Sequence, residues 1–325
     1  MINKTESIAK VNTVLGPVRP EKLGITSLHE HLIFDIRFSD PDDNRCMLEP
    51  DAAVEDMQRL FAAGGQTLVD QTCQGIGRDA FQLKTIAQQC DIQIIASTGF
   101  YREGAHPSYV AQESVDQLAA RMIRDIEVGI DGTDVRAGLI AEVATEGAKP
   151  FTTAQTKVYR AVAIAHQATG VSISAHCWCG NGALPLIELL VGHGVSSERI
   201  VIHHVGANRT PIQMALDILS TGAGIMTDCI GYGKTDGFID WHDLDRARFV
   251  AELFERGYGE RVTVSKDLCR KAHFTRFGGH GHQYLLTEFM PRLRAAGLSE
   301  NDLRQLLVDT PRGVLTPITT RHFSR

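Results

Sequence analysis

Eight short apolar runs rich in β-forming residues alternate with longer stretches of helical periodicity along this 325-residue chain. The runs are Gly24–Leu28, Gln66–Asp70, Ile92–Ser97, Gly138–Val143, Val171–Ala175, Ile200–His203, Ala223–Thr227 and Arg261–Ser265. Apolar residues recur at helical spacing in Asp51–Ala63, Gln112–Val128, Thr152–Ala168, Pro185–His193, Pro211–Ser220 and Asp245–Arg256. This alternation is typical of parallel strands joined by crossover helices.

The number of runs favours one fold among the α/β classes. Eight strand–helix units predict a single-domain (β/α)8 TIM barrel. A doubly wound open sheet is the competing fold, but it would be favoured by a Gly-rich phosphate loop after the first strand, and none follows Gly24–Leu28. No linker or low-complexity tract marks an internal boundary. We therefore expect an N-terminal leader or hairpin over 1–23 and a barrel with a C-terminal helical tail over 24–325.

Charge and cysteine content limit the partners and the compartment. Thirty-three basic against 39 acidic residues give a net charge of −6, which argues against nucleic-acid binding and against a polybasic membrane anchor. No apolar run reaches the length of about 18 residues that spans a bilayer, and the N-terminus lacks the apolar segment of a secretion signal. Seven scattered cysteines without zinc-finger spacing suggest reduced thiols. We expect a cytoplasmic protein that acts on a small molecule, with no nucleic-acid or membrane partner.

Histidines and carboxylates gather where the predicted strands end, which is where barrel enzymes carry their active sites. His29 and His31 end the first strand, and alternation places both imidazoles on one face. The other strand-end candidates are Glu142 on the fourth strand, His176 after the fifth, His203 and His204 at the sixth, and Asp267 after the eighth. Alternation predicts that His203 and His204 point to opposite sides, so that only one of them faces the barrel mouth.

This set of side chains suits divalent transition metals, because imidazole nitrogens and carboxylate oxygens bind zinc, manganese, cobalt and iron(II). With only one of His203 and His204 counted, six such residues exceed what one catalytic zinc requires, and they are enough for two metals that share a carboxylate. A mononuclear site of the deaminase type and a barrel that binds a ligand without catalysis remain as alternatives.

The order of several motifs resembles the phosphotriesterase-related branch of the amidohydrolase superfamily over almost the whole chain. The matching stretches are Val14–Val18 with Leu28–Leu32, Ser97–Tyr101, Gly138–Thr145, His176 followed by His204, Val264–Asp267 and Gly278–Leu286 before Phe289–Arg294. The resemblance implies a metal-dependent hydrolase that binds two divalent ions. Zinc is the first expectation for these ions, and manganese, cobalt and iron are the alternatives.

The resemblance also assigns roles to individual residues. It implies that His29 and His31 hold a buried metal with Asp267, and that His176 and His204 hold a more exposed one. The best-known members bridge their metals with a carbamylated lysine. Here Glu142 takes that place, as in a subset of relatives, and Lys149, the nearest lysine, is the weaker alternative.

A hydrolytic mechanism follows from this resemblance. A metal-bridging hydroxide would attack an electrophilic carbonyl or phosphorus centre, and Asp267 would carry its proton towards the leaving group. Tyr101 lies in the loop where lactonase relatives place a tyrosine beside the metals. It would donate a hydrogen bond to the developing oxyanion, or else serve in packing.

The substrate is narrowed by the loop after the eighth strand. Lys266, Arg270 and Lys271 follow one another there in an otherwise acidic protein, and they suit the binding of an anionic group. The long loop Gly231–His242 is Gly-rich and aromatic but lacks an apolar run that would cradle a fatty acyl chain. We expect a small, anionic lactone, carboxylic ester or amide, with a phosphoester or organophosphate as the alternative. Homodimers are common among relatives, so a homodimer stays open.

Overall fold

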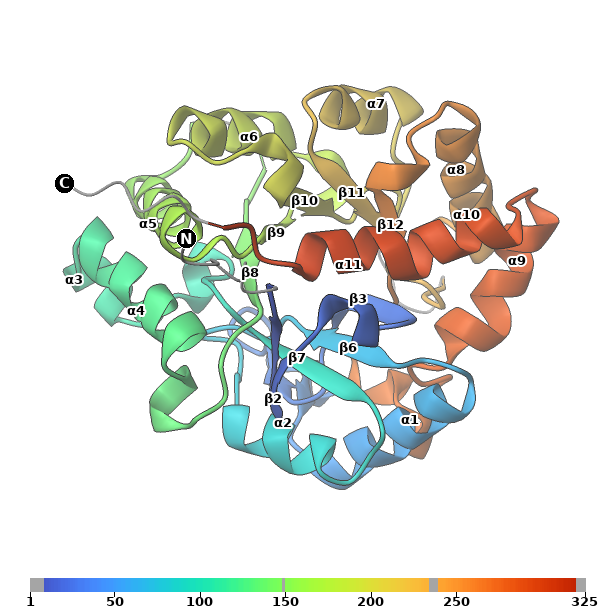
Figure 1. The fold of residues 1–325 in the computed structure, drawn as a ribbon, viewed down its shortest axis with the longest axis horizontal. Helices are drawn as coiled ribbons and strands as arrows, with labels where there is room; N and C mark the ends of the chain where they lie inside the picture. Colours follow the sequence, from blue (N-terminus) through green and yellow to red (C-terminus); the bar gives the residue numbers. More distant parts are fainter. Residues whose placement is uncertain (1–8, 148–149, 234–238, 320–325) are drawn as a thin grey trace, which may run out of the picture.

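The computed structural model describes residues 9–147, 150–233 and 239–319. Its centre is a sheet of eight parallel strands that follow one another in chain order, as the sequence predicts (Figure 1). The strands are β3 (Thr26–Glu30), β6 (Thr67–Asp70), β7 (Gln93–Thr98), β8 (Leu139–Ala144), β9 (Ile173–His176), β10 (Ile200–His203), β11 (Gly224–Thr227) and β12 (Val262–Val264).

The sheet closes on itself where its first and last strands meet. The backbone N–H of Asp267 donates to the carbonyl of His29 over 3.0 Å, and the hydroxyls of Ser27 and Ser265 lie 2.9 Å apart. The chain therefore folds as a single (β/α)8 barrel, and the doubly wound open sheet is excluded.

The helices lie outside the strands, as the bounds of the elements and Figure 1 show. They are α1 (Pro50–Ala62), α2 (Ala80–Ala87), α3 (Tyr109–Gln112), α4 (Val115–Glu127), α5 (Thr153–Thr169), α6 (Ala183–Gly192), α7 (Ile212–Ser220) and α8 (Asp243–Glu255). Side-chain hydroxyls of Ser114 and Thr152 cap the first turns of α4 and α5, each in a reciprocal capping box with the glutamine three residues on. Sequence reasoning assigned no helix to Ala80–Ala87, which is only two turns long.

Two apolar layers stabilise the barrel. The larger one fills the space between strands and helices, and the smaller one fills the barrel interior with residues such as Leu28, Val69 and Met226. Val11 and Leu315 belong to this inner layer. They come from the hairpin of β1 (Val11–Thr13) and β2 (Gly16–Val18) and from α11 (Thr310–Leu315). In Figure 1, α11, which lies near the C-terminus of the chain, crosses in front of the strands.

The C-terminal part of the chain carries α9 (Met290–Ala295), α10 (Glu300–Arg304) and α11. One π-helical stretch, Leu285–Phe289, precedes α9, and another, Gln305–Asp309, joins α10 to α11. The terminal helices and the hairpin cover one end of the barrel, which leaves the carboxyl ends of the strands open at the other. In the described ranges, no helix is both long enough and apolar enough to cross a membrane.

Candidate metal centre and active site

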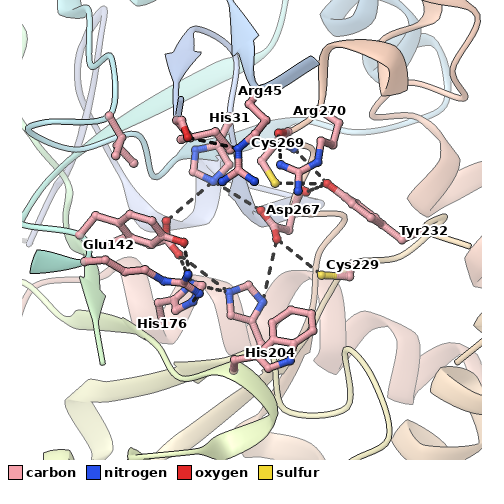
Figure 2. Close-up of a pocket in the computed structure, with 15 residues that line it drawn as sticks. His31, Arg45, Glu142, His176, His204, Cys229, Tyr232, Asp267, Cys269 and Arg270 are labelled. Carbon is pink, nitrogen blue, oxygen red and sulfur yellow. Dashed lines mark hydrogen bonds and ion pairs between the residues drawn. The ribbon is translucent and has the colours of Figure 1, made fainter. Parts of the chain in front are cut away.

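A pocket of about 290 Å³ lies where the strands end (Figure 2). Its lining combines histidines and carboxylates at the floor with arginines, aromatic residues and two cysteines: His31, Ile36, Arg45, Ile76, Tyr101, Arg102, Glu142, His176, Trp178, His204, Cys229, Tyr232, Asp267, Cys269 and Arg270. A ligand pocket at this end is what the barrel architecture favours.

His29, His31 and Asp267 form a first group of side chains whose atoms could bind a metal ion; below, such a group is called a donor group. His29 and His31 come from the first strand of the barrel, and Asp267 follows the last one. His29 Nε2 lies 3.5 Å from Asp267 Oδ1, and His31 Nε2 lies 3.4 Å from the same oxygen. His29 lies on β3 and His31 follows the end of that strand, and Asp267 has a left-handed backbone with a φ of 52°. The three donor atoms lie within 4.8 Å of one another, so one ion can contact all of them.

Glu142, His176 and His204 form a second group beside the first. His176 Nδ1 lies 2.9 Å from Glu142 Oε1 and 2.7 Å from His204 Nε2. Glu142 reaches the first group as well, since its Oε1 lies 3.6 Å from His29 Nε2 and its Oε2 lies 3.9 Å from His31 Nε2. The pairing of β8 with β9 is irregular between Ile140 and Val143, and Glu142 lies within this stretch of β8.

The chemistry of this cluster fits a bound cation. His29 Nε2 is buried and makes no hydrogen bond among the described residues, although it faces two carboxylates. Burial alone would lower the pKa of His29, but the charge of Asp267 and the hydrogen bond to Asp228 raise it to about 9. Burial would likewise raise the pKa of Glu142, whereas hydrogen bonds from His176 and its neighbours hold it well below its usual value. Carboxylates that stay ionised in a buried site suit a divalent metal.

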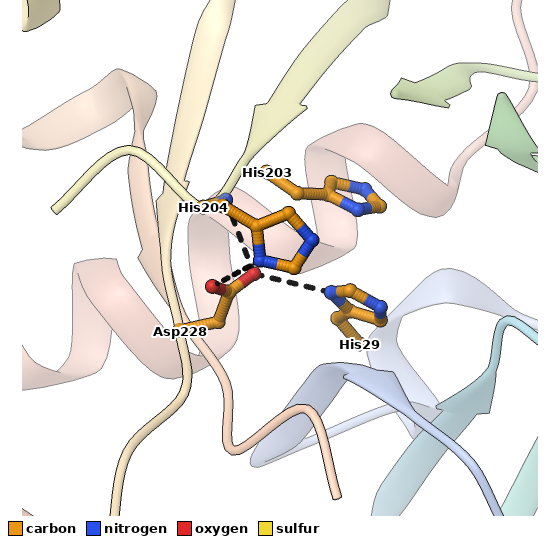
Figure 3. A group of neighbouring side chains, drawn as sticks. All are labelled: His29, His203, His204 and Asp228. Atoms are coloured by element: carbon orange, nitrogen blue, oxygen red, sulfur yellow. Dashed lines mark hydrogen bonds and ion pairs between the residues drawn. The ribbon is translucent and has the colours of Figure 1, made fainter. Parts of the chain in front are cut away.

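Asp228 is a member of the site that sequence reasoning missed. It follows β11 directly, is fully buried, and accepts hydrogen bonds from His29 Nδ1 over 3.1 Å and from His204 Nδ1 over 2.8 Å (Figure 3). These bonds leave the Nε2 atoms of both histidines directed at the donor groups described above. Its position in the sequence could have identified it, because Asp228 follows the end of a strand as the other candidates do.

The expectation that His203 and His204 point to opposite sides is wrong, although only His204 lines the pocket at the barrel mouth, as expected. Their ring centroids lie 5.8 Å apart, and the His203 ring lies 4.3 Å from that of His29 inside the barrel. His204 has a φ of 61°, which breaks the alternation of an extended strand. His203 hydrogen-bonds to Ser174 beneath the pocket, while His204 lines the pocket itself.

Glu30, the last residue of β3, lies between His29 and His31 in the sequence and has a defined place in the site. It is fully buried, and its Oε1 and Oε2 accept the backbone N–H groups of Lys266 and Leu268 over 2.8 and 3.0 Å. The hydroxyl of Ser265 donates to Oε1 over 2.9 Å. The carboxylate thus holds the loop that carries Asp267.

Tyr101 lies at the pocket, as expected from its loop. Its hydroxyl is 3.5 Å from His176 Nδ1, and its ring stands edge-on to that imidazole. Burial, followed by the charge of Glu142, raises the pKa of Tyr101, so its hydroxyl keeps its proton and remains a donor at neutral pH.

The cations proposed to bind substrate are not all in the pocket. Arg270 lines it, but Lys266 and Lys271 are not part of its lining. Lys266 is 1% exposed, and its Nζ donates to the carbonyl of Ile230 over 3.2 Å. Lys271 Nζ pairs with Glu49 over 2.5 Å. Because the charged ends of these two lysines are held by other groups, their substrate-binding role stays a prediction that the lining of the pocket does not support.

Arg45 and Arg102 line the pocket in their place, and sequence reasoning did not select them. Lys149, the alternative bridging residue, lies outside the described residues, as does the middle of the loop Gly231–His242 at 234–238.

Comparison with known proteins agrees with the geometry. The model of the phosphotriesterase family matches residues 9–315. Phosphotriesterase homology protein of Escherichia coli, crystallised with phosphate in its active site, superposes with a TM-score of 0.85 at 32% identity, over 90% of this chain and 99% of that chain. A lactonase from Listeria monocytogenes superposes with a TM-score of 0.87 at 25% identity, over 96% of this chain and 100% of that chain. N-acetyltaurine hydrolase of Dictyostelium discoideum is 27% identical over 97% of this chain and 100% of its own length.

Proposed function

This chain belongs to the phosphotriesterase family of hydrolases, and we propose that it is a binuclear metal-dependent hydrolase of small, anionic carboxylic esters, lactones or amides. One observation carries the proposal: the Glu142 carboxylate lies within 4 Å of histidines from both donor groups. A carboxylate in that position is suited to bridge two ions.

The proposed ligands are His29, His31 and Asp267 for one ion and His176 and His204 for the other, with Glu142 shared. Divalent cations in such a site, with zinc the first candidate, supply an activated water molecule and a Lewis acid for the scissile carbonyl. Asp267 accepts the proton of the attacking water at a carboxylate oxygen and returns it to the leaving group. The protonated hydroxyl of Tyr101 donates to the developing oxyanion.

The choice of esters and amides rests on the relatives and on the pocket. The relatives include a lactonase and an N-acetyltaurine hydrolase, which act on a cyclic ester and on an anionic amide by their names. A pocket of about 290 Å³ is at the small end of the range of about 300–1,000 Å³ for ligand sites, which disfavours long acyl chains. The phosphate bound by the Escherichia coli relative keeps a phosphoester hydrolase as the second candidate.

The seven free cysteines support a reducing compartment, so we propose a cytoplasmic location. A small molecule is the proposed partner, and a homodimer is the assembly to test by light scattering.

The test is a metal analysis combined with a substrate screen of the purified protein. We expect about two metal equivalents and hydrolysis of lactones, carboxylic esters or N-acyl amino acids. One equivalent with full activity would contradict a binuclear site, and neutral phosphotriesters turned over much faster than anionic esters would contradict the substrate class. Asp267→Asn separates an enzyme from a ligand-binding barrel, because an enzyme loses hydrolysis in the variant that retains its metals.

A further inference from the structure

The turn Lys266–Cys269, which carries the last residue of the first donor group, has a bonding partner for each of its backbone N–H groups. Two of them donate to the carboxylate of Glu30, and one donates to the carbonyl of His29. The last, that of Cys269, donates to the hydroxyl of Tyr232 over 3.2 Å. Tyr232 therefore holds the same turn as Glu30, but from a different part of the chain.

The hydroxyl of Tyr232 also bonds to Asp267 itself. It donates to the backbone carbonyl of Asp267 over 2.6 Å, and Figure 2 shows the side chain reaching towards Asp267 and Cys269. Burial raises the pKa of Tyr232 well above its usual value, so the hydroxyl keeps the proton that this bond requires. Because that one proton is given to Asp267, the hydroxyl acts on the protein rather than on a substrate.

Tyr232 is itself held in place by neighbouring groups. Its ring stands edge-on to the imidazole of His273, with the two centroids 4.3 Å apart. Its carbonyl accepts from Nη1 of the fully buried Arg246 over 3.4 Å. The same guanidinium donates to the carbonyl of Ala207 over 2.8 Å and pairs with Asp243 over 2.8 Å. The backbone of Tyr232 is therefore anchored to α8, the helix that carries Arg246.

A second side chain joins the same two segments in the opposite direction. Lys266, next to Asp267, is 1% exposed and donates from Nζ to the carbonyl of Ile230 over 3.2 Å. Its Nζ also lies 5.7 Å from the centroid of the Tyr232 ring, within the range of a cation–π contact. The segment 229–233 and the turn 266–269 are thus tied by bonds from both sides, so a shift of one displaces the other.

Tyr232 belongs to the wall of the pocket as well. It is 3% exposed and packs with Ala207, Cys229 and Ile239 in a small apolar cluster beside the proposed metal ligands. A ligand that contacts this wall therefore contacts the residue that bonds to Asp267.

We propose that Tyr232 is a positioning residue, which holds the Asp267 carboxylate in place and couples it to the pocket wall formed by the segment 229–233. The inference rests on the proposed function for the role of Asp267 as metal ligand and proton acceptor. The left-handed backbone of Asp267, with its φ of 52°, persists only where the surroundings hold it. Without the hydroxyl of Tyr232, the turn loses two of these bonds and the carboxylate moves away from the first donor group.

Tyr232→Phe tests the bonds directly, because it keeps the ring and removes only the hydroxyl. In the metal-free protein, hydrogen exchange of the Cys269 amide should become about tenfold faster, since the amide loses its acceptor. Tyr258→Phe is the matched control, because Tyr258 precedes β12 and is not part of the pocket lining. An exchange rate of the Cys269 amide that is unchanged in Tyr232→Phe would overturn the proposal.

Metal binding distinguishes positioning from a general loss of stability. Asp267 belongs to only one of the two donor groups, so zinc titrated against a chelator should bind about tenfold more weakly at one site of Tyr232→Phe. The other site should keep its affinity within about twofold. Equal weakening at both sites, or at neither, would overturn the positioning role.

Kinetics of the best substrate from the screen above complete the test. In Tyr232→Phe, kcat should fall about tenfold while KM stays within about twofold, because the ring still forms the pocket wall. A raised KM with kcat unchanged would make Tyr232 a substrate-binding residue and overturn the proposal.

The inference and the proposed function can fail separately. A protein that hydrolyses no compound of the screen, but in which Tyr232→Phe speeds exchange and weakens one zinc site, would refute the proposed function and support the positioning role. Hydrolysis in which Tyr232→Phe changes neither kcat, exchange nor zinc affinity would support the hydrolase and refute the positioning role.

Discussion

The carboxylate of Glu30 accepts hydrogen bonds from the backbone N–H groups on both sides of Asp267. Asp267 itself has a φ of 52°, a left-handed conformation that costs about 1 kcal/mol or more for a residue with a side chain. The hydrogen bonds from Lys266 and Leu268 hold this turn, so Glu30 determines where the Asp267 carboxylate lies without touching it.

Glu30→Gln is expected to weaken both folding and metal binding. The amide keeps one acceptor oxygen but presents an NH₂ group to one of the two backbone N–H donors. We expect the free energy of unfolding of the metal-free protein to fall by about 1–3 kcal/mol, measured by urea denaturation. Metal affinity, measured by chelator competition, should fall as well. Exposed Glu21→Gln is the control, and wild-type values of both quantities in Glu30→Gln would contradict this role.

Asp228→Asn tests the residue that orients two of the histidines. The carboxylate accepts from the Nδ1 atoms of both His29 and His204, and an asparagine can accept from only one of them through its single oxygen. Loss of such an outer partner typically lowers metal affinity 10–100-fold. Chelator competition checks this value, with exposed Asp217→Asn as the control. An affinity within twofold of the wild type would show that the histidines are oriented by other contacts.

Sequence patterns predicted the fold well because every strand–helix unit repeats the same two periodicities, two residues in the strand and 3.6 residues in the helix. The rule that barrel enzymes carry their active sites at the carboxyl ends of the strands also selected the residues that lie together in the cluster. These strand ends meet at one place regardless of the conformation of the loops. His29 and His31 stand out through their spacing, whereas Asp228 was missed because a single aspartate after a strand is also an ordinary turn residue.

The direction of the charged side chains could not be predicted from the sequence. Lys266 and Arg270 follow the same strand, yet Lys266 points to the carbonyl of Ile230 and Arg270 lines the pocket. The left-handed backbones at Asp267 and His204 reverse the alternation that an extended chain would give. Arg45 and Arg102 come from irregular loops, whose path depends on tertiary contacts rather than on periodicity.

Glu142→Gln should change the number of bound metals more than the fold. The glutamine keeps the size of the side chain but removes the negative charge that both donor groups face. We expect metal analysis to fall from about two equivalents towards one or fewer. Metal addition should also raise the Tm less than in the wild type, because fewer ions bind the native state. Glu146→Gln, on an exposed side chain nearby, is the control. Two tightly held equivalents in Glu142→Gln would argue that another residue is the shared ligand.

Acid should remove the stability that Asp56 provides. Asp56 on α1 accepts from His282 Nδ1 over 3.0 Å and from the backbone N–H of Thr275 over 3.1 Å, which ties α1 to the loop after β12. Burial would raise the pKa of Asp56, but these contacts hold it below its usual value. A lowered folded-state pKa gives stability that is present above the unfolded pKa of about 3.9 and is lost as the pH falls through the folded value.

Urea denaturation of the metal-free wild type and Asp56→Asn at several pH values measures this contribution. The wild type should be the more stable protein at pH 6–7, and the difference should shrink below about pH 4. Exposed Asp91→Asn should show a far smaller difference at neutral pH. A difference between wild type and Asp56→Asn that grows on acidification would contradict the assigned direction of the pKa shift.

Leu315→Ala should destabilise the barrel without altering its chemistry. Leu315 on α11 is 1% exposed and packs with Val11 and Leu28 in the inner apolar layer, so its truncation leaves a cavity at the end of the barrel opposite the pocket. Such substitutions cost about 2–5 kcal/mol of unfolding free energy. We expect that loss in urea denaturation, with kcat and KM unchanged at temperatures where the variant is folded. Ile318→Ala is the control, because that side chain is 44% exposed and should change stability little. A raised KM in Leu315→Ala would contradict this prediction. It would mean that a cavity at one end of the barrel alters the pocket at the opposite end.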